Sequence, residues 1–418
     1  MSHNKSQSDI NFFLQLGYFP RFKQSVTLDL GGISKSRYES ANEEELITEA
    51  KNVFDQSFDA LFAKHQASAK HVVPISGGMD SRAILCALLE RTPADTINTY
   101  TFGTPGTYDF DIGCMIAKAA GTHQTAIPLD DHPWTLNDFD EAAQRFDHQT
   151  FLFHHAPMTR LKSFEDGITW SGYIGDAVTG GHLKKAPSET LKVAKRTYVK
   201  NRKESRSINV LKEGAQKVYQ GVGGESFTHE ALSYDEQVLF AEVGSITAPH
   251  VLMKGFNYET PFINSPIFDF FMSIPSSARR DQNLFKTFLL QTYPALFTLP
   301  CKTSFGLPLT SLRPRKFLRR ARNKMLNIRR SYRPNKQFKA LPMTNFFDVD
   351  LMIRSHKGIQ EDVHTRLQDL QKRGCVPWID IDAIWSNHME GRAHHGDVLK
   401  ILFSLETNLQ GLEKGGGA

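Results

Sequence analysis

The stretch HVVPISGGMDSRAILCALLE, residues 71–90, carries the strongest structural signal in the chain. It begins with apolar, β-branched residues, continues through two adjacent glycines and ends with the apolar spacing of a helix. This order predicts a buried strand, a tight turn and a helix. Glycines at such a turn let the backbone approach a ligand and point its N–H groups toward it. The helix N-terminus adds partial positive charge, so the turn is suited to an anion.

The side chains of this turn indicate phosphate together with a divalent cation. Ser76 and Ser81 can donate hydroxyl hydrogen bonds to phosphate oxygens, beside the backbone of Gly77 and Gly78. Asp80 alone would repel phosphate, so its presence favours Mg²⁺ between the carboxylate and the phosphate. The stretch is not a P-loop, which ends in Gly-Lys-Ser or Gly-Lys-Thr. The simpler alternative is a tight turn with a helix cap.

Helical and strand patterns alternate around this turn. Apolar spacing predicts helices over residues 43–65, 81–90 and 109–121, and strands over 71–75, 97–103 and 167–171. The alternation predicts an α/β fold with a parallel sheet flanked by helices, followed by a mostly helical C-terminal part. Ligands of such sheets bind outside the carboxyl ends of the strands, which is where the glycine turn lies.

Composition narrows the class of protein. The chain has 418 residues, of which 40% are hydrophobic and 23% charged, as in an ordinary soluble globular protein. Its apolar runs are too short for a membrane span, and its first residues lack the apolar core of a signal peptide. The four cysteines are scattered without a CxxC pair, which predicts a reducing cytoplasm and no zinc or disulfide framework.

Positive charge is concentrated in two stretches. Residues 311–340 contain twelve Lys or Arg and no acid, and a second basic stretch begins at Lys184. One interpretation is a pair of solvated helices or loops, and the other is a peripheral contact with a polyanion or an anionic membrane surface. The stretches lack the interleaved aromatic platform of single-strand nucleic-acid binders, so no nucleic-acid partner is expected.

Several segments together resemble the asparagine synthetase family. PISGGMDSRAIL, from Pro74, resembles its pyrophosphate loop, and the segment 99–124 resembles the strand and helix that hold its adenine and ribose. ITWSGYIGDAVTGGH, from Ile168, is similar to the family's SGExxDExxGGY element. Segments 259–280, 281–309 and 386–409 resemble its VPFLD segment, its lysine-containing stretch and its closing helix. The resemblance spans roughly residues 40–410 with its elements in the family's order.

The resemblance implies a fold and a reaction. The fold would be adenine nucleotide α-hydrolase-like, the PP-loop or N-type ATP pyrophosphatase domain, over residues 41–410 including the basic segment 311–340. Such enzymes cleave ATP between its α- and β-phosphates, form an acyl-adenylate on a substrate carboxylate, and let an amine displace AMP. ATP and Mg²⁺ are the implied cofactors.

The resemblance also implies roles for individual residues. Asp80 and Asp176 would bind Mg²⁺, and Lys302 would stabilise the charge of the adenylation step. The remaining ATP and pyrophosphate positions would be Ser76, Gly77, Gly78, Ser81, Arg82, Phe102, Gly103, Asp109, Gly172 and Lys286. Arg82 can equally point to solvent, and Asp109 can equally be a plain N-cap.

Two departures from the family pattern change the expected chemistry. Residues 1–40 resemble only the tail of a glutaminase domain, so the nitrogen would come from an amine, from ammonia or from a separate glutaminase partner. Tyr173 stands where asparagine synthetases carry Glu, and Ala177 stands where they carry a second acid. Tyr173 is in frame with a Tyr of β-lactam synthetases, which implies deprotonation of the amine with Glu242 as its partner. The alternative is a tyrosine that only closes the pocket.

The resulting hypothesis is an ATP-dependent amide-forming ligase acting on a small-molecule, sugar or peptide carboxylate, in surface-polysaccharide or natural-product biosynthesis. Alternatives are an ammonia-dependent asparagine synthetase, a lasso-peptide or β-lactam-type cyclase, and a non-catalytic nucleotide-binding scaffold. Adjacent His154 and His155 would point apart on a helix and have no evident third ligand, so they are not expected to bind a metal.

Overall fold

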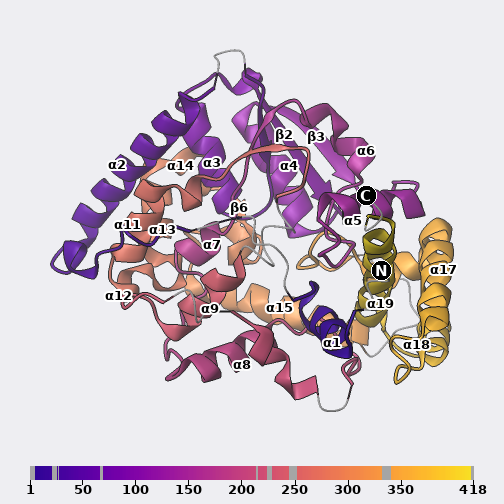
Figure 1. The fold of residues 1–418 in the computed structure, drawn as a ribbon. Coiled ribbons are helices and arrows are strands. Elements are labelled where there is room, and N and C mark those ends of the chain that lie inside the picture. Colours follow the sequence, from indigo (N-terminus) through magenta and orange to yellow (C-terminus); the bar gives the residue numbers. More distant parts are fainter. Residues whose placement is uncertain are drawn as a thin grey trace.

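A computed structural model describes residues 5–20, 26, 28–65, 69–212, 215–223, 228–243, 252–331 and 340–415. Its centre is a five-stranded sheet in the order β3-β2-β1-β4-β5, in which every pairing is parallel (Figure 1). The strands are β1 (His71–Pro74), β2 (Ile97–Gly103), β3 (His123–Pro128), β4 (Ile168–Trp170) and β5 (Asn257–Glu259). The predicted α/β fold with a parallel sheet is confirmed.

Helices cover both faces of the sheet. Val72 and Val73 are consecutive, fully buried residues of β1, and they belong to different hydrophobic clusters because successive side chains of a strand point to opposite faces. The face of Val73 is covered by α2 (Glu43–Phe62), α3 (Asp80–Leu89), α4 (Tyr108–Ala120), α11 (Ser265–Ser273), α13 (Asn283–Thr292) and α14 (Pro294–Phe297). The face of Val72 is covered by α1 (Gln7–Leu16), α5 (Leu136–Arg145), α6 (Met158–Leu161), α16 (Val349–Ser355), α17 (Lys357–Arg373), α18 (Ile381–Met389) and α19 (Gly396–Gly415).

Periodicity located the central strands and missed the edges of the sheet. The strands predicted over 71–75, 97–103 and 167–171 correspond to β1, β2 and β4. Strand β3 lies at one edge and leaves most of its side chains partly exposed, so its sequence lacks a strong apolar pattern. Strand β5, at the other edge, has only three residues. Helix α4 ends as predicted at Gly121, which adopts a left-handed conformation (φ 74°).

The described part of the N-terminal 40 residues is built into the body of the protein. Ser6 caps α1 and accepts a hydrogen bond from the Asp9 backbone N–H at 3.2 Å. The fully buried ring of Phe13 then packs on Phe19 and Phe151, with centroid distances of 4.8 and 5.6 Å. Helix α1 therefore contributes to the same core as the C-terminal helices.

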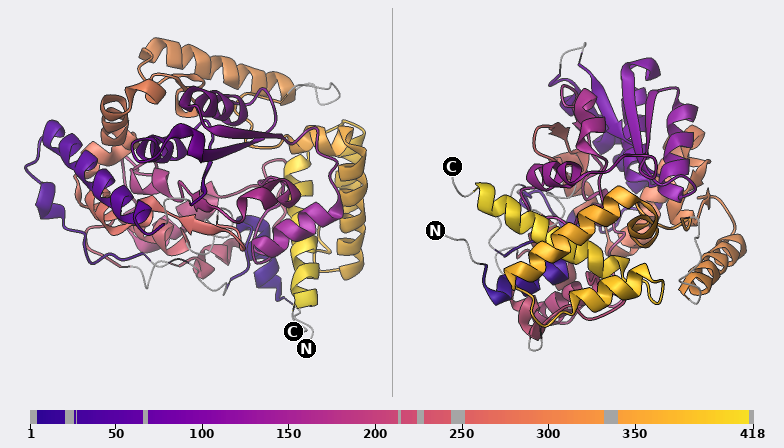
Figure 2. Two further views of the ribbon diagram at one scale, coloured as in Figure 1. Left: turned by 90° about the horizontal axis from the view of Figure 1, so that it is seen from above. Right: turned by 90° about the vertical axis from the view of Figure 1, so that its right-hand side faces the viewer.

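The remaining elements lie below and beside this body. Helices α8 (Leu191–Asn201), α9 (Tyr234–Glu242) and α12 (Ser276–Arg279) lie along the bottom of Figure 1, and α7 (Gly175–Val178) follows β4. Strands β6 (Pro300–Cys301) and β7 (Leu307–Pro308) form a small antiparallel pair. Helix α15 (Arg313–Ser331) stands apart from the other helices (Figure 2). None of the helices over the described residues combines the length and apolar character that a membrane crossing requires.

We expect Phe13→Ala to lower the free energy of unfolding by about 3–5 kcal/mol, because it empties a fully buried aromatic site. Gln7→Ala, an exposed position of the same helix, should change it by less than about 0.5 kcal/mol. Urea denaturation of the full chain measures both. If the two variants unfolded alike, α1 would not belong to the cooperative core.

Candidate functional site

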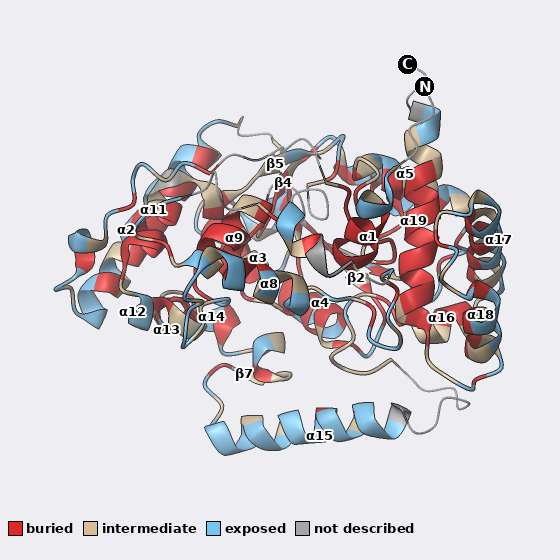
Figure 3. Ribbon diagram, turned by 60° about the horizontal axis from the view of Figure 1, so that its bottom comes forward, coloured by how far each residue is buried: buried red, intermediate tan, exposed pale blue. Residues whose placement is uncertain are grey.

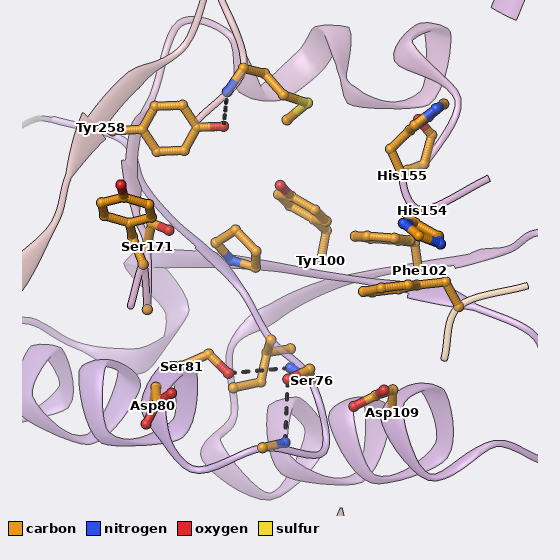
Figure 4. A pocket seen from close by; sticks show the side chains of 18 of the residues that line it. Ser76, Asp80, Ser81, Tyr100, Phe102, Asp109, His154, His155, Ser171 and Tyr258 are labelled. Atoms are coloured by element: carbon orange, nitrogen blue, oxygen red, sulfur yellow. Dashed lines mark hydrogen bonds between the residues drawn. The ribbon is translucent and has the colours of Figure 1, made fainter. Parts of the chain in front are cut away.

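A cavity of about 370 Å³ opens at the carboxyl ends of β1, β2 and β4 (Figure 4). Its polar side carries the glycine turn and the segment after β4: Ser76, Gly78, Asp80, Ser81, Ser171, Gly172 and Asp176. Its other side is mainly aromatic: Tyr100, Phe102, Phe146, His154, His155, Tyr258 and Phe346. The cavity therefore joins a compartment suited to phosphate to one suited to a flat or apolar group.

The glycine turn is held by its own serines. Ser76 Oγ accepts a hydrogen bond from the Gly78 N–H at 3.3 Å, and the Ser76 N–H donates to Ser81 Oγ at 3.4 Å. Helix α3 begins at Asp80, and Met79 at its N-cap has no side-chain capping bond. The simpler alternative of a turn serving only as a side-chain cap is therefore not supported.

Asp80 and Asp176 come together on the polar side of the cavity. Asp80 Oδ1 is buried and has no hydrogen-bond partner among the described residues. Burial raises the pKa of Asp80 well above its ordinary value, and the charge of Asp176 raises it further. Desolvation works against ionisation of Asp176, whose side chain is still 57% exposed, but the bond from His182 Nε2 at 2.9 Å, the charges of His182 and Arg202 and a backbone hydrogen bond together lower its pKa. The Asp80 carboxyl group, with its Oδ1 unpaired, thus lies beside the ionised Asp176.

Two glycines of the segment after β4 permit this close approach. A Cβ atom on Gly172 would lie 3.0 Å from the Asp80 Cβ, and one on Gly175 would lie 2.7 Å from the Asp80 Cγ. Between them, Ile174 adopts a left-handed conformation (φ 51°, ψ 15°). A β-branched residue there is strained by about 1–3 kcal/mol, and such strain is concentrated at functional sites. The turn that presents Asp176 is therefore tightly constrained.

Lys302 approaches the glycine turn from its other side. Its backbone N–H donates to the Gly77 carbonyl at 2.8 Å, and its ammonium group bonds to the Asp109 carboxylate and, at 2.5 Å, to Asn345 Oδ1. Gly77 also lets the turn approach the start of α4, because a Cβ there would lie 2.5 Å from the Tyr108 carbonyl oxygen. Gly77 thus serves a close approach between protein backbones, whereas the sequence suggested an approach to ligand.

The expected pair of Tyr173 and Glu242 does not form. The Tyr173 hydroxyl donates to the backbone carbonyl of Val243 at 3.1 Å, whereas Glu242 bonds to the Tyr18 hydroxyl and the Gly223 N–H. Tyr173 lines the cavity, and burial raises its pKa above the ordinary value. Glu242 was predicted as the partner of Tyr173, and the observed partner is the next residue, Val243. Spacing along the sequence does not determine the direction of side chains at the end of α9.

Arg82 and Lys286 do not face the cavity. The buried Arg82 guanidinium donates to the carbonyls of Leu296 and Pro300, at 3.2 and 2.8 Å, and so ties α3 to the segment before Lys302. The Lys286 ammonium bonds to the carbonyl of Asp281. Neither side chain lines the cavity: Arg82 has a structural role, Lys286 makes a local backbone contact, and a phosphate contact by either stays a prediction.

The sequence motifs did not predict most of the aromatic side of the cavity. Phe102, an expected nucleotide contact, stacks on Phe346 with a centroid distance of 5.2 Å. Phe346 follows the basic segment and no motif marks it. His154 and His155, considered only as metal ligands, both line the cavity, and His154 Nε2 lies 3.0 Å from the Lys400 ammonium. An aromatic-rich sequence, FLFHH, was the only signal available.

We expect Arg82→Met to lower the free energy of unfolding by about 2–4 kcal/mol, because it removes two hydrogen bonds that a buried, charged guanidinium donates to backbone carbonyls. Arg160→Met, at an exposed position, should change it by less than about 0.5 kcal/mol. Chemical denaturation compares the two. If the two variants had equal free energies of unfolding, the hydrogen bonds of Arg82 would not stabilise the fold. A role of Arg82 in binding a ligand in the cavity would then be favoured.

His155 predicts a loss of stability in acid. Its Nδ1–H donates to the Ala156 carbonyl, and burial lowers its pKa to about 4 from an ordinary value of 6.5. The unfolded chain therefore binds the proton first, so the contribution of His155 is complete above pH 6.5 and falls, by roughly 3 kcal/mol in total, as the pH drops toward 4. Unfolding curves across this range should be steeper in pH for the wild type than for His155→Phe. Parallel profiles would contradict the assignment.

The structure brings most of the predicted site residues to one cavity. Those that line it are Ser76, Gly78, Asp80, Ser81, Phe102, Asp109, Gly172, Tyr173 and Asp176. Those outside its lining are Gly77, Arg82, Gly103, Glu242, Lys286 and Lys302, although Lys302 reaches its edge through Asp109. No family model matches the chain, and a search of curated proteins finds no significant match.

Proposed function

We propose that this chain is an ATP-dependent amide-forming ligase of the asparagine synthetase type. It would activate a substrate carboxylate as an acyl-adenylate, release pyrophosphate and transfer the acyl group to an amine or ammonia. The observation that carries this proposal is the buried, unpaired Oδ1 of Asp80 beside Asp176, at a glycine turn outside the carboxyl end of a parallel strand. A buried carboxyl oxygen without a hydrogen-bond partner is unfavourable unless something else binds it.

Mg²⁺ fits this pair of carboxylates. Asp80 and Asp176 would hold it, and when bound it neutralises charge on the departing pyrophosphate. The described residues contain no cluster of three or more ligating His, Cys, Asp or Glu side chains. Two carboxylates beside serine hydroxyls suit a cation that enters with a phosphate substrate, since Mg²⁺ usually takes only one or two protein carboxylates.

The protein's own groups would bind and orient the nucleotide. Ser76, Ser81 and the Gly78 N–H, which line the polar side of the cavity, would bind the β- and γ-phosphates, and the stacked Phe102 and Phe346 would pack on adenine. Lys302, held by Asp109 and Asn345, would stabilise charge on the α-phosphate as the carboxylate attacks.

Tyr173 is assigned a positioning role toward the amine. Burial raises its pKa, so the hydroxyl stays protonated and donates to the Val243 carbonyl. This argues against a tyrosinate base of the kind implied by the resemblance to β-lactam synthetases. We expect Tyr173 instead to shape the entry of the amine, which is the alternative of a tyrosine that closes the pocket.

The charges that line the cavity affect which substrate carboxylates it can accept. Its lining, among the described residues, includes Asp80, Asp109 and Asp176 but no Lys or Arg. Free aspartate would bring a second carboxylate, and the lysine at the cavity edge, Lys302, is already bonded to Asp109 and Asn345. This favours a sugar, natural-product or peptide carboxylate with an uncharged remainder over an ammonia-dependent asparagine synthetase.

Pyrophosphate release tests the proposal. With ATP, Mg²⁺, pooled carboxylates and hydroxylamine as a general nucleophile, we expect pyrophosphate and a hydroxamate whose mass identifies the acid. Asp80→Asn should lower the rate at least about a hundredfold, because it removes charge from the cation site while keeping the side-chain shape. The exposed control Asp95→Asn should behave like the wild type.

Other products would point elsewhere. ADP and phosphate in place of AMP and pyrophosphate, or full activity of Asp80→Asn, would refute the mechanism. Tight ATP binding without turnover on any carboxylate would favour the nucleotide-binding scaffold. Tyr173→Phe should leave pyrophosphate release intact and slow only the transfer to bulky amines, since the ring is kept and only the hydroxyl is lost.

A further inference from the structure

Helix α15 (Arg313–Ser331) exposes an unusual amount of apolar surface. Of the eight large apolar side chains that are most exposed among the described residues, four lie on this helix and a fifth, Leu312, directly precedes it. The four are exposed to 71% (Phe317), 67% (Leu318), 64% (Met325) and 47% (Ile328). In Figure 3 the helix lies apart from the body and is drawn as exposed along most of its length. Scattered apolar residues need no explanation, but a concentration on one helix does.

These side chains form a single face. Since an α-helix turns by about 100° per residue, five positions fall within an arc of about 100°. They are Phe317, Leu318, Ala321, Met325 and Ile328. Exposed basic side chains border this arc on both sides: Arg320 and Lys324 on one, Arg322 and Arg329 on the other. Residues 311–331 contain nine Lys or Arg and no acid.

The helix meets the rest of the protein with its polar side. The Lys316 ammonium donates to the Leu309 carbonyl at 2.7 Å, and the Asn323 amide lies 3.5 Å from the Tyr108 hydroxyl. Asn323 is the buried residue of this helix, whereas Phe317 and Met325 are exposed. A helix that packs on a globular core turns its apolar face inward, so α15 has the opposite orientation.

We propose that α15 is an interfacial helix that binds an anionic lipid membrane. Its apolar face would enter the boundary between headgroups and acyl chains, and the flanking arginines and lysines would contact lipid phosphates. Charge selects this occupant: a second copy of α15 on the same face would oppose nine positive charges with nine. Binding to a nucleic-acid backbone would leave the apolar face uncovered. The proposal does not depend on the ligase chemistry.

Vesicle sedimentation with the full-length protein tests this proposal. We expect binding to vesicles of phosphatidylcholine and phosphatidylglycerol in equal amounts, little binding to phosphatidylcholine alone, and weakening as salt is raised. Phe317→Ser combined with Leu318→Ser should reduce partitioning at least about tenfold, because it removes half of the large apolar residues of the face. Arg320→Gln combined with Lys324→Gln should reduce it by a similar factor.

Matched controls lie on other helices. Met115→Ser with Val193→Ser removes two exposed apolar side chains, and Lys192→Gln with Lys200→Gln removes two exposed charges from the second basic stretch. Both pairs should bind like the wild type. Tryptophan emission gives a second readout: Phe317→Trp should shift to the blue with anionic vesicles, and Arg322→Trp, at the border of the apolar arc, should shift less.

Three results would overturn the proposal. Wild-type protein could fail to bind anionic vesicles, the Phe317 and Leu318 variant could bind as well as the wild type, or the controls could lose as much binding as the α15 variants. Dissociation of a dimer by the Phe317 and Leu318 variant, without vesicle binding by the wild type, would assign the face to a second copy of the chain.

Discussion

The packing of the Asp80 carboxylate against the segment after β4 is the constraint on which the site depends. Asp80 is the first residue of α3, and the glycines at 172 and 175 leave only enough room for it. Its Oδ1 is thereby buried without a partner, beside the ionised Asp176. The folded protein thus maintains an unfavourable arrangement of two carboxylates, and a positively charged ligand would relieve it.

The rest of the site supports that arrangement from several segments. The parallel sheet brings the ends of β1, β2 and β4 to one edge, so the glycine turn, Phe102 and Ser171 face the same cavity. Arg82 ties α3 to the carbonyls of Leu296 and Pro300, and the neighbouring Lys302 backbone bonds to Gly77. A residue expected to hold phosphate thus instead fixes the segment that carries the lysine. Contacts within the protein therefore hold the glycine turn and the helix after it in place without a ligand.

The sequence predicted the elements that have strong hydrophobic periodicity. It did not predict the direction in which individual long side chains point. Two local signals predict the parallel sheet. One is the unit of strand, glycine turn and helix, and the other is the alternation of strands and helices around it. The polar edge strand β3 and the three-residue β5 have no comparable pattern. Glu242 and Arg82 were placed near the site but point away from it, since spacing along a chain does not determine which way a long side chain turns. Phe346 and Asn345 join the site only through tertiary packing.

Asn345 has a consequence for the segment that precedes it. Its side chain meets the Lys302 ammonium, so the segment that joins these two residues, which includes α15, begins and ends at nearly the same point of the body. Leu309 is buried near one end of this segment, and the Pro342 carbonyl accepts a hydrogen bond from the Tyr108 N–H near the other, so the part that carries α15 is held at both ends. The entropy of closing such a loop changes by only about 0.6 kcal/mol when its length doubles. Its length and composition can therefore vary widely while the two residues that close it keep their contact, and what the loop attaches to can change separately from the chemistry at its base.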